Sequence, residues 1–251
     1  MNILVCVKRV PLTGGKINLT EDERAIQTRH LGFTVSPHEE CAAEEAIRLV
    51  EGHGGESVAL TLGPAEAEEQ LRDMMAIGID RGIHLVTDGD EWDAQATAAA
   101  IIAAIREDGT PFDLLLFGNE SADAGNYQVA VRVAYALGLP VVNGIKAITV
   151  DGDRLRCEQE VPGGRDVYEV PTPAVVTVKE GINLPRYPSV PGRMRAKRKP
   201  LASSRPGRSE ARLEMVRLKL PEGTSKQADV LGHGADAAPR VVEVLTEIGV
   251  M

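Results

Sequence analysis

Aromatic residues are scarce in this sequence: they make up 3% of its 251 residues, whereas hydrophobic residues of all kinds make up 43%. A core has to be built mainly from Ala, Val, Leu and Ile, which favours helices packed closely on a sheet. Cysteine is also rare, because Cys6, Cys41 and Cys157 are the only three and lie far apart. This number and spacing suggest neither a disulfide framework nor a zinc site, and they fit a reducing cytoplasm.

Positive charge and long apolar runs are lacking as well. The formal net charge of −9 argues against nucleic acid as a partner and against adsorption to an anionic membrane surface. The most apolar window, residues 94–105, is too short and too rich in Ala to span a bilayer, and residues 1–10 lack the pattern of a signal peptide. We therefore expect a cytoplasmic protein that does not insert into a membrane.

The motifs of common nucleotide-dependent and hydrolytic enzymes are missing too. There is no Walker motif, no GxGxxG after the first predicted strand and no serine in a nucleophile elbow. The five histidines show no metal-ligand spacing, and the position of His38 in the first turn of a predicted helix is more typical of a solvated or capping residue than of a general base. We predict no catalytic residues and no metal site, and hence a protein that is not itself an enzyme.

Short apolar strands alternate with helical patterns through the first half of the chain. The predicted strands are residues 3–7, 57–62, 83–86 and 113–117, and apolar residues recur at helical spacing between them. Parallel neighbours need helical crossovers, and right-handed crossovers put helices on both faces of a sheet. The predicted fold class is therefore α/β, a doubly wound parallel sheet of the type that binds adenine nucleotides.

The first crossover helix has a predicted start in four residues, Ser36 to Glu39. Ser36 is expected as the N-cap, Pro37 at the first helical position, and Glu39 as the residue that completes a capping box. The glycines at positions 52, 54 and 55 are expected to end this helix.

The pattern changes after Pro140. Four strand-like runs, residues 145–150, 154–161, 167–170 and 174–178, follow one another without helical spacing between them. They predict an antiparallel extension of the sheet, closed by hairpins. Residues 201–251 are mostly polar up to a short terminal helix at 240–248, and we expect them to form an arm that does not fold alone.

The stretch from Asp113 to Pro140 predicts a strand, a loop and a helix in that order. If the helix begins near Asn126, the free N–H groups of Tyr127, Gln128 and Val129 attract anions, phosphate above all. In an open parallel sheet, ligands bind outside the carboxyl ends of the strands, which gathers this loop, the end of the first strand and the Ser36 helix start around one crevice. A nucleotide would fit there, but an ordinary strand-to-helix connection explains the same residues equally well.

Residues 181–200 combine four prolines with six Lys or Arg residues. This basic cluster is either a solvated loop or a docking segment for an acidic protein partner. A nucleic-acid patch is disfavoured because Tyr187 is the only aromatic residue there.

The segment 183–200, NLPRYPSVPGRMRAKRKP, resembles the signature segment of electron transfer flavoprotein β subunits. Members of that family usually have Asn-Glu-Pro-Arg-Tyr, a short linker, Leu-Pro and then Met-Lys-Ala-Lys-Lys-Lys. Further phrases agree in the family's order, namely VKRVP, AAEEAIRL, GPAEA, MAIGIDRGIHL, PAVVTV and LTEIGV. The resemblance covers nearly the whole chain and is specific.

The resemblance implies a heterodimer with an α subunit that holds FAD, and AMP bound in this chain. The pair would carry electrons from acyl-CoA-type dehydrogenases to electron transfer flavoprotein–quinone oxidoreductase. Residues 1–200 would form the nucleotide-binding domain, with a dehydrogenase recognition loop at 183–200, and residues 201–251 an arm that packs on the α subunit. Two alternatives stay open: a bifurcating protein with a second FAD in place of AMP, and an adenine-nucleotide hydrolase or sensor of the same architecture.

The resemblance also assigns residues. It assigns Cys6, Gly118, Asp123 and Gln128 to the nucleotide site, to which the sheet geometry adds Ser36, Leu62, Gly125, Asn126 and Val129. The expected partner-docking residues are Pro185, Arg186, Tyr187, Val190, Pro191, Met194, Arg195 and Lys197. Val190 stands where the family's anchor is normally Leu, which removes one methylene, worth about 0.8 kcal/mol if fully buried. His38 replaces an aromatic residue that often approaches the flavin, and is the expected flavin neighbour.

Overall fold

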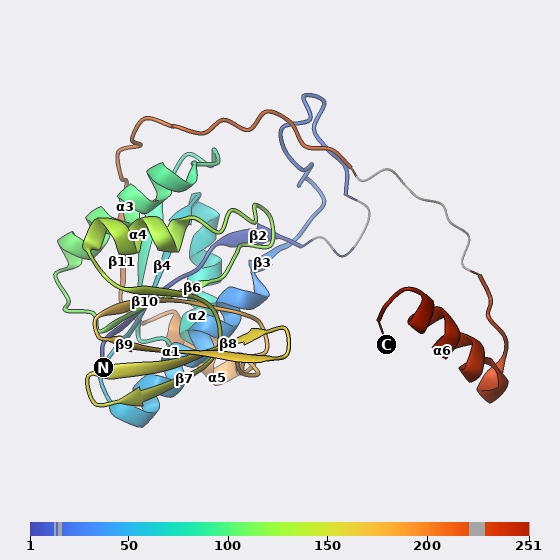
Figure 1. Ribbon diagram of the computed structural model, residues 1–251. Coiled ribbons are helices and arrows are strands. Elements are labelled where there is room, and N and C mark those ends of the chain that lie inside the picture. Colours follow the sequence, from blue (N-terminus) through green and yellow to red (C-terminus); the bar gives the residue numbers. More distant parts are fainter. Residues whose placement is uncertain (13, 15–16, 221–228, 251) are drawn as a thin grey trace. The chain divides into compact units, whose positions relative to one another are not determined.

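The structure of the chain is a computed structural model that describes residues 1–12, 14, 17–220 and 229–250 (Figure 1). The chain divides into two compact units, Met1–Val216 and Arg217–Met251. The first unit contains the sheet and five α-helices, and the second contains a short 3-10 helix, η2 (Gly234–Ala237), and α6 (Ala238–Glu247).

A nine-stranded sheet forms the centre of the first unit, in the order β11-β5-β4-β1-β6-β10-β7-β8-β9. All neighbours from β11 to β7 run parallel, whereas β7, β8 and β9 pair antiparallel. The prediction of a doubly wound parallel sheet with an antiparallel extension is confirmed. The strands are β1 (Ile3–Cys6), β4 (Ser57–Gly63), β5 (Arg81–Val86), β6 (Leu114–Gly118), β7 (Val141–Asp151), β8 (Arg154–Val161), β9 (Gly164–Pro171), β10 (Ala174–Val178) and β11 (Leu201–Ser204).

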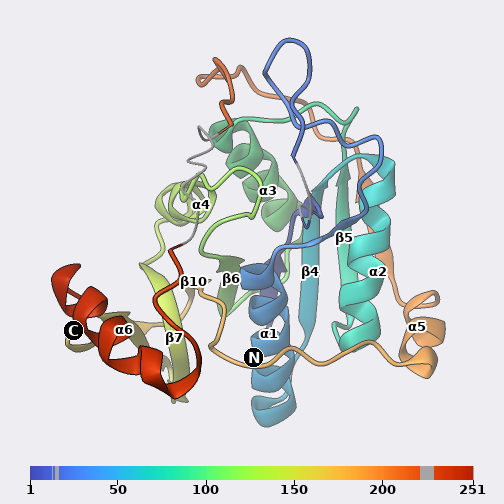
Figure 2. The same ribbon diagram turned by 90° about the vertical axis from the view of Figure 1, so that its right-hand side faces the viewer.

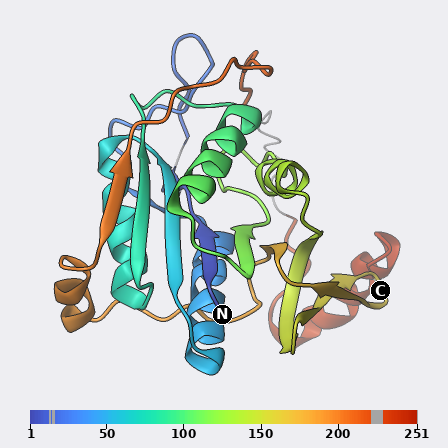
Figure 3. The same ribbon diagram turned by 90° about the vertical axis from the view of Figure 1, so that its left-hand side faces the viewer.

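Side chains that alternate along each central strand create two separate hydrophobic clusters. Ile3 and Val5 of β1 face α1 (Pro37–His53) and α2 (Glu68–Ile77), whereas Leu4 and Cys6 face α3 (Ala94–Asp108) and α4 (Val129–Leu137). Figure 2 shows α1 and α2 on one face of the sheet, and Figure 3 shows the other face, where the green helices α3 and α4 lie. Because both faces are covered, β1 and β6 have no polar side chain at any position.

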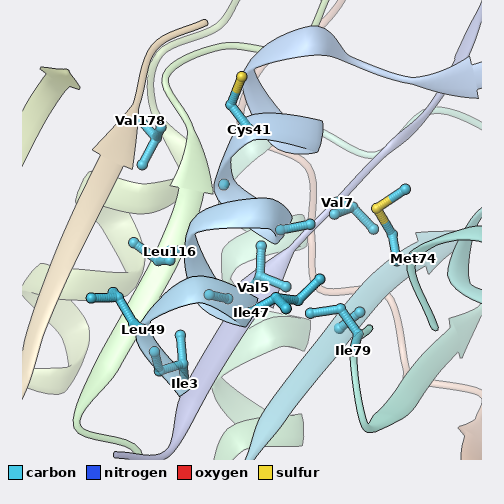
Figure 4. Packing of buried hydrophobic residues seen from close by; sticks show 14 of the residues in the cluster. Ile3, Val5, Val7, Cys41, Ile47, Leu49, Met74, Ile79, Leu116 and Val178 are labelled. Carbon is cyan, nitrogen blue, oxygen red and sulfur yellow. The ribbon is translucent and has the colours of Figure 1, made fainter. Parts of the chain in front are cut away.

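Small residues let α1 pack closely against the sheet. Its buried stripe includes Ala42, Ala43, Ala46 and Ile47, and the helix ends at His53, before Gly54, within the glycines predicted to end it. Figure 4 shows Ile47 and Leu49 of this helix next to Ile3, Val5 and Leu116 of the central strands. Because α1 packs so closely on the sheet, the core is filled with few aromatic side chains.

The start of α1 differs from the prediction in one respect. Ser36 is the N-cap and Pro37 opens the helix, but the Ser36 hydroxyl makes no capping bond and instead donates to the carbonyl of Glu120, 3.4 Å away. The predicted capping box is therefore wrong in its Ser36 half, because the hydroxyl is used to hold a neighbouring loop.

The run Ala174–Val178 was expected in the antiparallel extension, and this is wrong. It forms β10, which inserts between β6 and β7 and pairs parallel with both. The chain leaves the parallel part of the sheet at β7, forms the β8–β9 hairpin and returns through β10. A run of mostly β-branched residues that follows prolines gives no sign of which neighbours it will pair with.

The predicted arm also begins later than expected. Leu201–Ser204 forms β11, an edge strand that pairs parallel with β5, so residues 201–204 are part of the sheet. In the second unit, α6 contains the predicted terminal helix, and no residue of α6 is buried. Ahead of the sheet's first crossover, β2 (Arg9–Pro11) and β3 (Phe33–Val35) pair antiparallel, and residues 13, 15 and 16 of the loop between them lie outside the described residues.

The three cysteines are unpaired and buried. Burial raises the pKa of each thiol, to about 11 for Cys157. Within the described ranges, no helix has both the length and the apolar character needed to cross a membrane.

A short helix, α5 (Val190–Ala196), lies on α2 where the sequence predicted a loop. Ser189 caps it by accepting a hydrogen bond from the N–H of Gly192, 3.1 Å away. Arg72 of α2 donates to the carbonyls of Ala196 and Lys199 at 2.8 and 3.0 Å, and so satisfies the open carboxyl end of α5. The contact is close because a Cβ on Gly192 would lie 2.4 Å from the carbonyl oxygen of Ala76.

Replacing Gly192 with Ala should therefore loosen α5. The added methyl overlaps a backbone atom that cannot rotate away, so we expect a loss of about 1–3 kcal/mol in the free energy of unfolding. Urea unfolding measures the loss. Gly207→Ala is the matched control, because nothing lies within 4 Å of its Cβ position, and its effect should stay within about 0.5 kcal/mol. Equal effects of the two substitutions would contradict the packing described for α5.

Candidate functional site

The strand order changes direction at β1, which lies between β4 and β6. From β1 the chain proceeds through α1 and α2 to β4 and β5 on one side, and then crosses through α3 to β6 on the other. The carboxyl ends of β1 and β6 thus diverge into connections on opposite faces of the sheet. This is a topological switch point, the place where open α/β sheets bind ligands.

A cavity of about 400 Å³ lies at this edge of the sheet. It is bounded by the start of α1, by the loop after β6 and by Glu180, which follows β10. Four of the predicted site residues line it, namely Ser36, His38, Asp123 and Gly125. The other lining residues, which the sequence did not single out as binding residues, are Pro37, Glu120, Ser121, Ala122, Ala124 and Glu180.

The remaining predicted nucleotide-binding residues lie near the cavity without lining it. Cys6 ends β1 and is 7% exposed, and Leu62 of β4 is half-buried against the α3 and α4 side. Gly118 ends β6 and packs against α1. Asn126, Gln128 and Val129 follow the cavity loop toward α4, and the Gln128 side chain accepts hydrogen bonds from Arg132 at 2.9 and 3.2 Å.

The helix after the loop begins at Val129, so the expected start near Asn126 is wrong. Tyr127 has φ +55°, which is rare for a residue with a side chain, and Gln128 after it returns to the right-handed region. Backbone that alternates between left- and right-handed conformations can gather successive N–H groups around an anion. In the part of the chain that the structure describes, the N–H groups of Tyr127, Gln128 and Val129 donate to no other group.

Gly118 is required by the close approach of α1 to the end of β6. A Cβ at this position would lie 2.6 Å from the Cγ of Glu39 and 3.2 Å from the Cβ of His38. No larger residue fits between the strand end and the first turn of the helix. The glycine therefore fixes the distance between two walls of the cavity.

Glu39 is buried, 6% exposed, behind the cavity wall. Its carboxylate accepts a 2.6 Å hydrogen bond from the backbone N–H of Lys8, directly after β1. Burial raises the pKa of Glu39 to about 8, although the N–H and the charge of Lys8 oppose this shift. Near neutral pH the group is mostly protonated.

Lys8 connects two loops at the carboxyl edge of the sheet. Its Nζ lies 2.7 Å from Glu91, in the loop before α3, and 2.8 Å from Asp123, in the cavity loop. Burial alone would lower the pKa of Lys8, but Glu91 and Asp123 more than offset this and raise it. The role of Lys8 was not predicted from the sequence. Its position just past a predicted central strand could have indicated it, because ligands bind at the carboxyl ends of such strands.

Three lining residues of the cavity are acidic, namely Glu120, Asp123 and Glu180, and none of the Lys or Arg residues that the structure describes lines it. Lys8 neutralises Asp123, and among the described residues the buried Nδ1 of His38 has no hydrogen-bond partner. An anion at this site would therefore depend on backbone N–H groups rather than on several basic side chains.

The segment 183–199 carries a second candidate surface, on α5 and the residues before it. Four large apolar side chains are strongly exposed there: Leu184 (89%), Tyr187 (95%), Val190 (77%) and Met194 (60%). Arg195 and Lys197 are exposed beside them, and within the described residues neither forms an ion pair. Pro185 is half-buried and Pro191 exposed, whereas Arg186 is paired within the chain. A cluster of exposed apolar residues with basic neighbours is typical of a protein interface.

The fold and the site together define a doubly wound α/β protein with a cavity at its switch point and a separate segment of exposed apolar residues. The sequence model of the electron transfer flavoprotein domain matches residues 25–205. Three relatives are each named electron transfer flavoprotein subunit beta. The protein of Syntrophomonas wolfei is 38% identical over 222 residues, which is 88% of this chain and 86% of the relative. The protein of Bacillus subtilis is 34% identical over 254 residues (98% and 97%), and that of Homo sapiens is 33% identical over 210 residues (82% and 82%).

The chain therefore belongs to the electron transfer flavoprotein β subunit family. This confirms the resemblance, and it places the chain in the electron-transfer role that the family is named for.

The raised pKa of Glu39 predicts that the free energy of unfolding depends on pH. Its pKa in the folded chain lies above the ordinary value of 4.5, so the folded state binds more protons than the unfolded state between pH 4.5 and about 8. Stability should fall as pH rises through this window, by up to about 1.4 kcal/mol per pH unit from this group. The Glu39→Gln substitution keeps an acceptor for the Lys8 N–H but cannot ionise, so this fall in stability with rising pH should disappear.

Urea unfolding of the wild-type and Glu39→Gln chains from pH 5 to 9 tests this. The difference in unfolding free energy should grow in favour of the variant up to about pH 8 and then stay constant. Glu21→Gln, at an exposed position, controls for the loss of one negative charge. A difference that does not change with pH would show that Glu39 ionises normally.

Proposed function

We propose that this chain is the AMP-binding β subunit of a heterodimeric electron carrier whose α subunit holds FAD. In this proposal the carrier accepts electrons from acyl-CoA-type dehydrogenases in the cytoplasm and delivers them to electron transfer flavoprotein–quinone oxidoreductase. Family membership supports the electron-transfer role. The observation that carries the proposal is the separation of two surfaces, a cavity at the switch point and an exposed apolar segment on α5 and before it.

Binding of AMP is supported by the geometry of the cavity loop. In this proposal the N–H groups of Tyr127 to Val129, which follow the cavity loop and have no partner among the described residues, bind one phosphate, and the volume of the cavity lies in the range of small-molecule sites. In the proposal, Ser36 and Asp123 hold the loop and the helix start that enclose the nucleotide, because Ser36 bonds Glu120 and Asp123 pairs with Lys8. His38 lies at the same cavity and is the residue that we place toward the flavin.

The second unit supports the proposal that the chain pairs with an α subunit. Its helix α6 exposes Val241, Val242 and, just after its end, Ile248. A helix with a strong apolar stripe and no buried residue has to pack on another surface to be stable. We propose that residues 217–251 are the arm that packs on the α subunit.

Docking of a dehydrogenase is supported by the exposed residues of the 183–199 segment. Val190 begins α5 and is held at the surface by the contact of that helix with α2. We propose that Val190 enters an apolar pocket of the dehydrogenase, while Arg195 and Lys197 attract its acidic surface.

The AMP proposal predicts the small molecules bound by the purified heterodimer. Co-expressed subunits, denatured and analysed by mass spectrometry, should release one AMP and one FAD per heterodimer. Two FAD and no AMP would support the bifurcating alternative instead. Neither nucleotide in this chain, together with hydrolysis of ATP by the isolated chain, would support the hydrolase or sensor alternative and overturn the proposal.

The docking proposal predicts opposite effects of two substitutions at one position. Val190→Ala removes two methyl groups and should raise the KM of an acyl-CoA dehydrogenase for the heterodimer by roughly 15-fold, whereas Val190→Leu should lower it by about fourfold. The maximal rate should not change. Steady-state reduction of the heterodimer by the dehydrogenase and its acyl-CoA measures both values. An unchanged KM in both variants would exclude Val190 as the anchor.

A further inference from the structure

Arg186 lies near the start of segment 183–199, here called the docking segment, but its guanidinium is turned back onto α1. Its Nε and Nη2 bond Glu44 at 2.9 and 3.0 Å, and its Nη1 and Nη2 bond Glu51 at 2.8 and 3.0 Å. The backbone N–H of Arg186 also donates to Glu44, at 3.1 Å. One side chain thus bridges two carboxylates that lie seven residues apart on the same face of α1.

The two carboxylates differ in their surroundings. The Glu44 side chain is only 5% exposed, whereas that of Glu51 is 58% exposed. A buried carboxylate without a partner is strongly unfavourable, so Glu44 fixes where the guanidinium has to lie. Arginine suits this position because its planar group makes two parallel hydrogen bonds to each of two carboxylates, which the single ammonium of lysine cannot do.

A second anchor lies three residues earlier. The side-chain amide of Asn183 donates to the carbonyl of Cys41 and to Glu45, both at 2.9 Å. Residues 183 and 186 are therefore held on α1, and Leu184 and Tyr187, which directly follow them, point outward and are 89% and 95% exposed. Figure 2 shows this segment running past α1 to α5, which α2 holds at the far end.

We infer that Arg186 is a positioning residue, which orders the docking segment by clamping it to α1 and does not itself contact the dehydrogenase. This inference rests on the proposed docking function, because it assumes that the exposed residues of the segment are the ones recognised. A segment held in its bound form before the encounter loses less conformational entropy on binding. The clamp therefore assigns Arg186 a function different from that of Arg195 and Lys197, which have no partner among the described residues.

The test compares variants of the co-expressed heterodimer in its reduction by an acyl-CoA dehydrogenase. Arg186→Gln should raise the KM for the heterodimer roughly tenfold without changing the maximal rate, and Arg186→Lys should give an intermediate value. Arg186→Gln/Glu44→Gln removes the unpaired buried charge as well, so its thermal midpoint and flavin content should match those of the wild type. Its KM should stay raised, because the clamp is still absent. A normal KM in this double variant would overturn the inference.

The dependence of the association rate on salt separates positioning from direct contact. Arg186→Gln/Glu44→Gln removes one positive and one negative charge and so keeps the net charge, and this double variant should leave the slope of the association rate against ionic strength unchanged. Arg195→Gln should reduce that slope, because Arg195 is unpaired and exposed. An equal reduction in both variants would show that Arg186 contacts the dehydrogenase, and would overturn the positioning role.

Val190→Ala distinguishes the failure of this inference from the failure of the proposed function. If Val190→Ala raises the KM and Arg186→Gln does not, the docking surface stands and the clamp has no role. If Val190→Ala leaves the KM unchanged, the docking surface itself is wrong.

Discussion

The packing of α1 on the centre of the sheet is the constraint on which both candidate sites depend. The helix lies against β1 and β6 through small residues such as Ala42, Ala43 and Ala46, none of which is exposed to solvent. Its first turn forms one wall of the switch-point cavity, and its second half carries the carboxylates that hold the docking segment. A shift of α1 would change both sites together, since packed interiors do not deform continuously.

The two candidate sites of the first unit also differ in how their charged side chains are paired. At the carboxyl edge of the sheet, basic and acidic side chains neutralise one another, as Lys8 does with Glu91 and Asp123, so backbone amides are left to recognise an anion. On the docking segment, Arg186 pairs with Glu44 and Glu51 and Arg193 pairs with Asp73, whereas Arg195 and Lys197 form no ion pair among the described residues. The chain is acidic in total, yet it keeps one local basic surface.

The sequence predicted most of the layered architecture because alternating faces and glycine-bounded helices are local signals. It did not predict the place of β10, because the partners of a short apolar strand are fixed by the return path of the hairpin before it. The structure places Ser36 and Asp123 in the cavity lining, and the Glu39 carboxyl bonds the Ser36 N–H as the predicted capping box requires. Its further hydrogen bond with the N–H of Lys8, 31 residues earlier in the chain, has no local signature. Arg186 was expected to face a partner for a similar reason: its acidic partners lie on a helix 135 and 142 residues away.

The burial of all three cysteines has a practical consequence for following this protein in solution. Each thiol is enclosed and its pKa is raised, so a maleimide or nitroxide reagent finds almost no thiolate on the native chain. A single cysteine introduced at a surface position would be modified selectively, without first removing the natural ones. The docking segment can thus carry one spectroscopic reporter while the rest of the molecule keeps its own side chains.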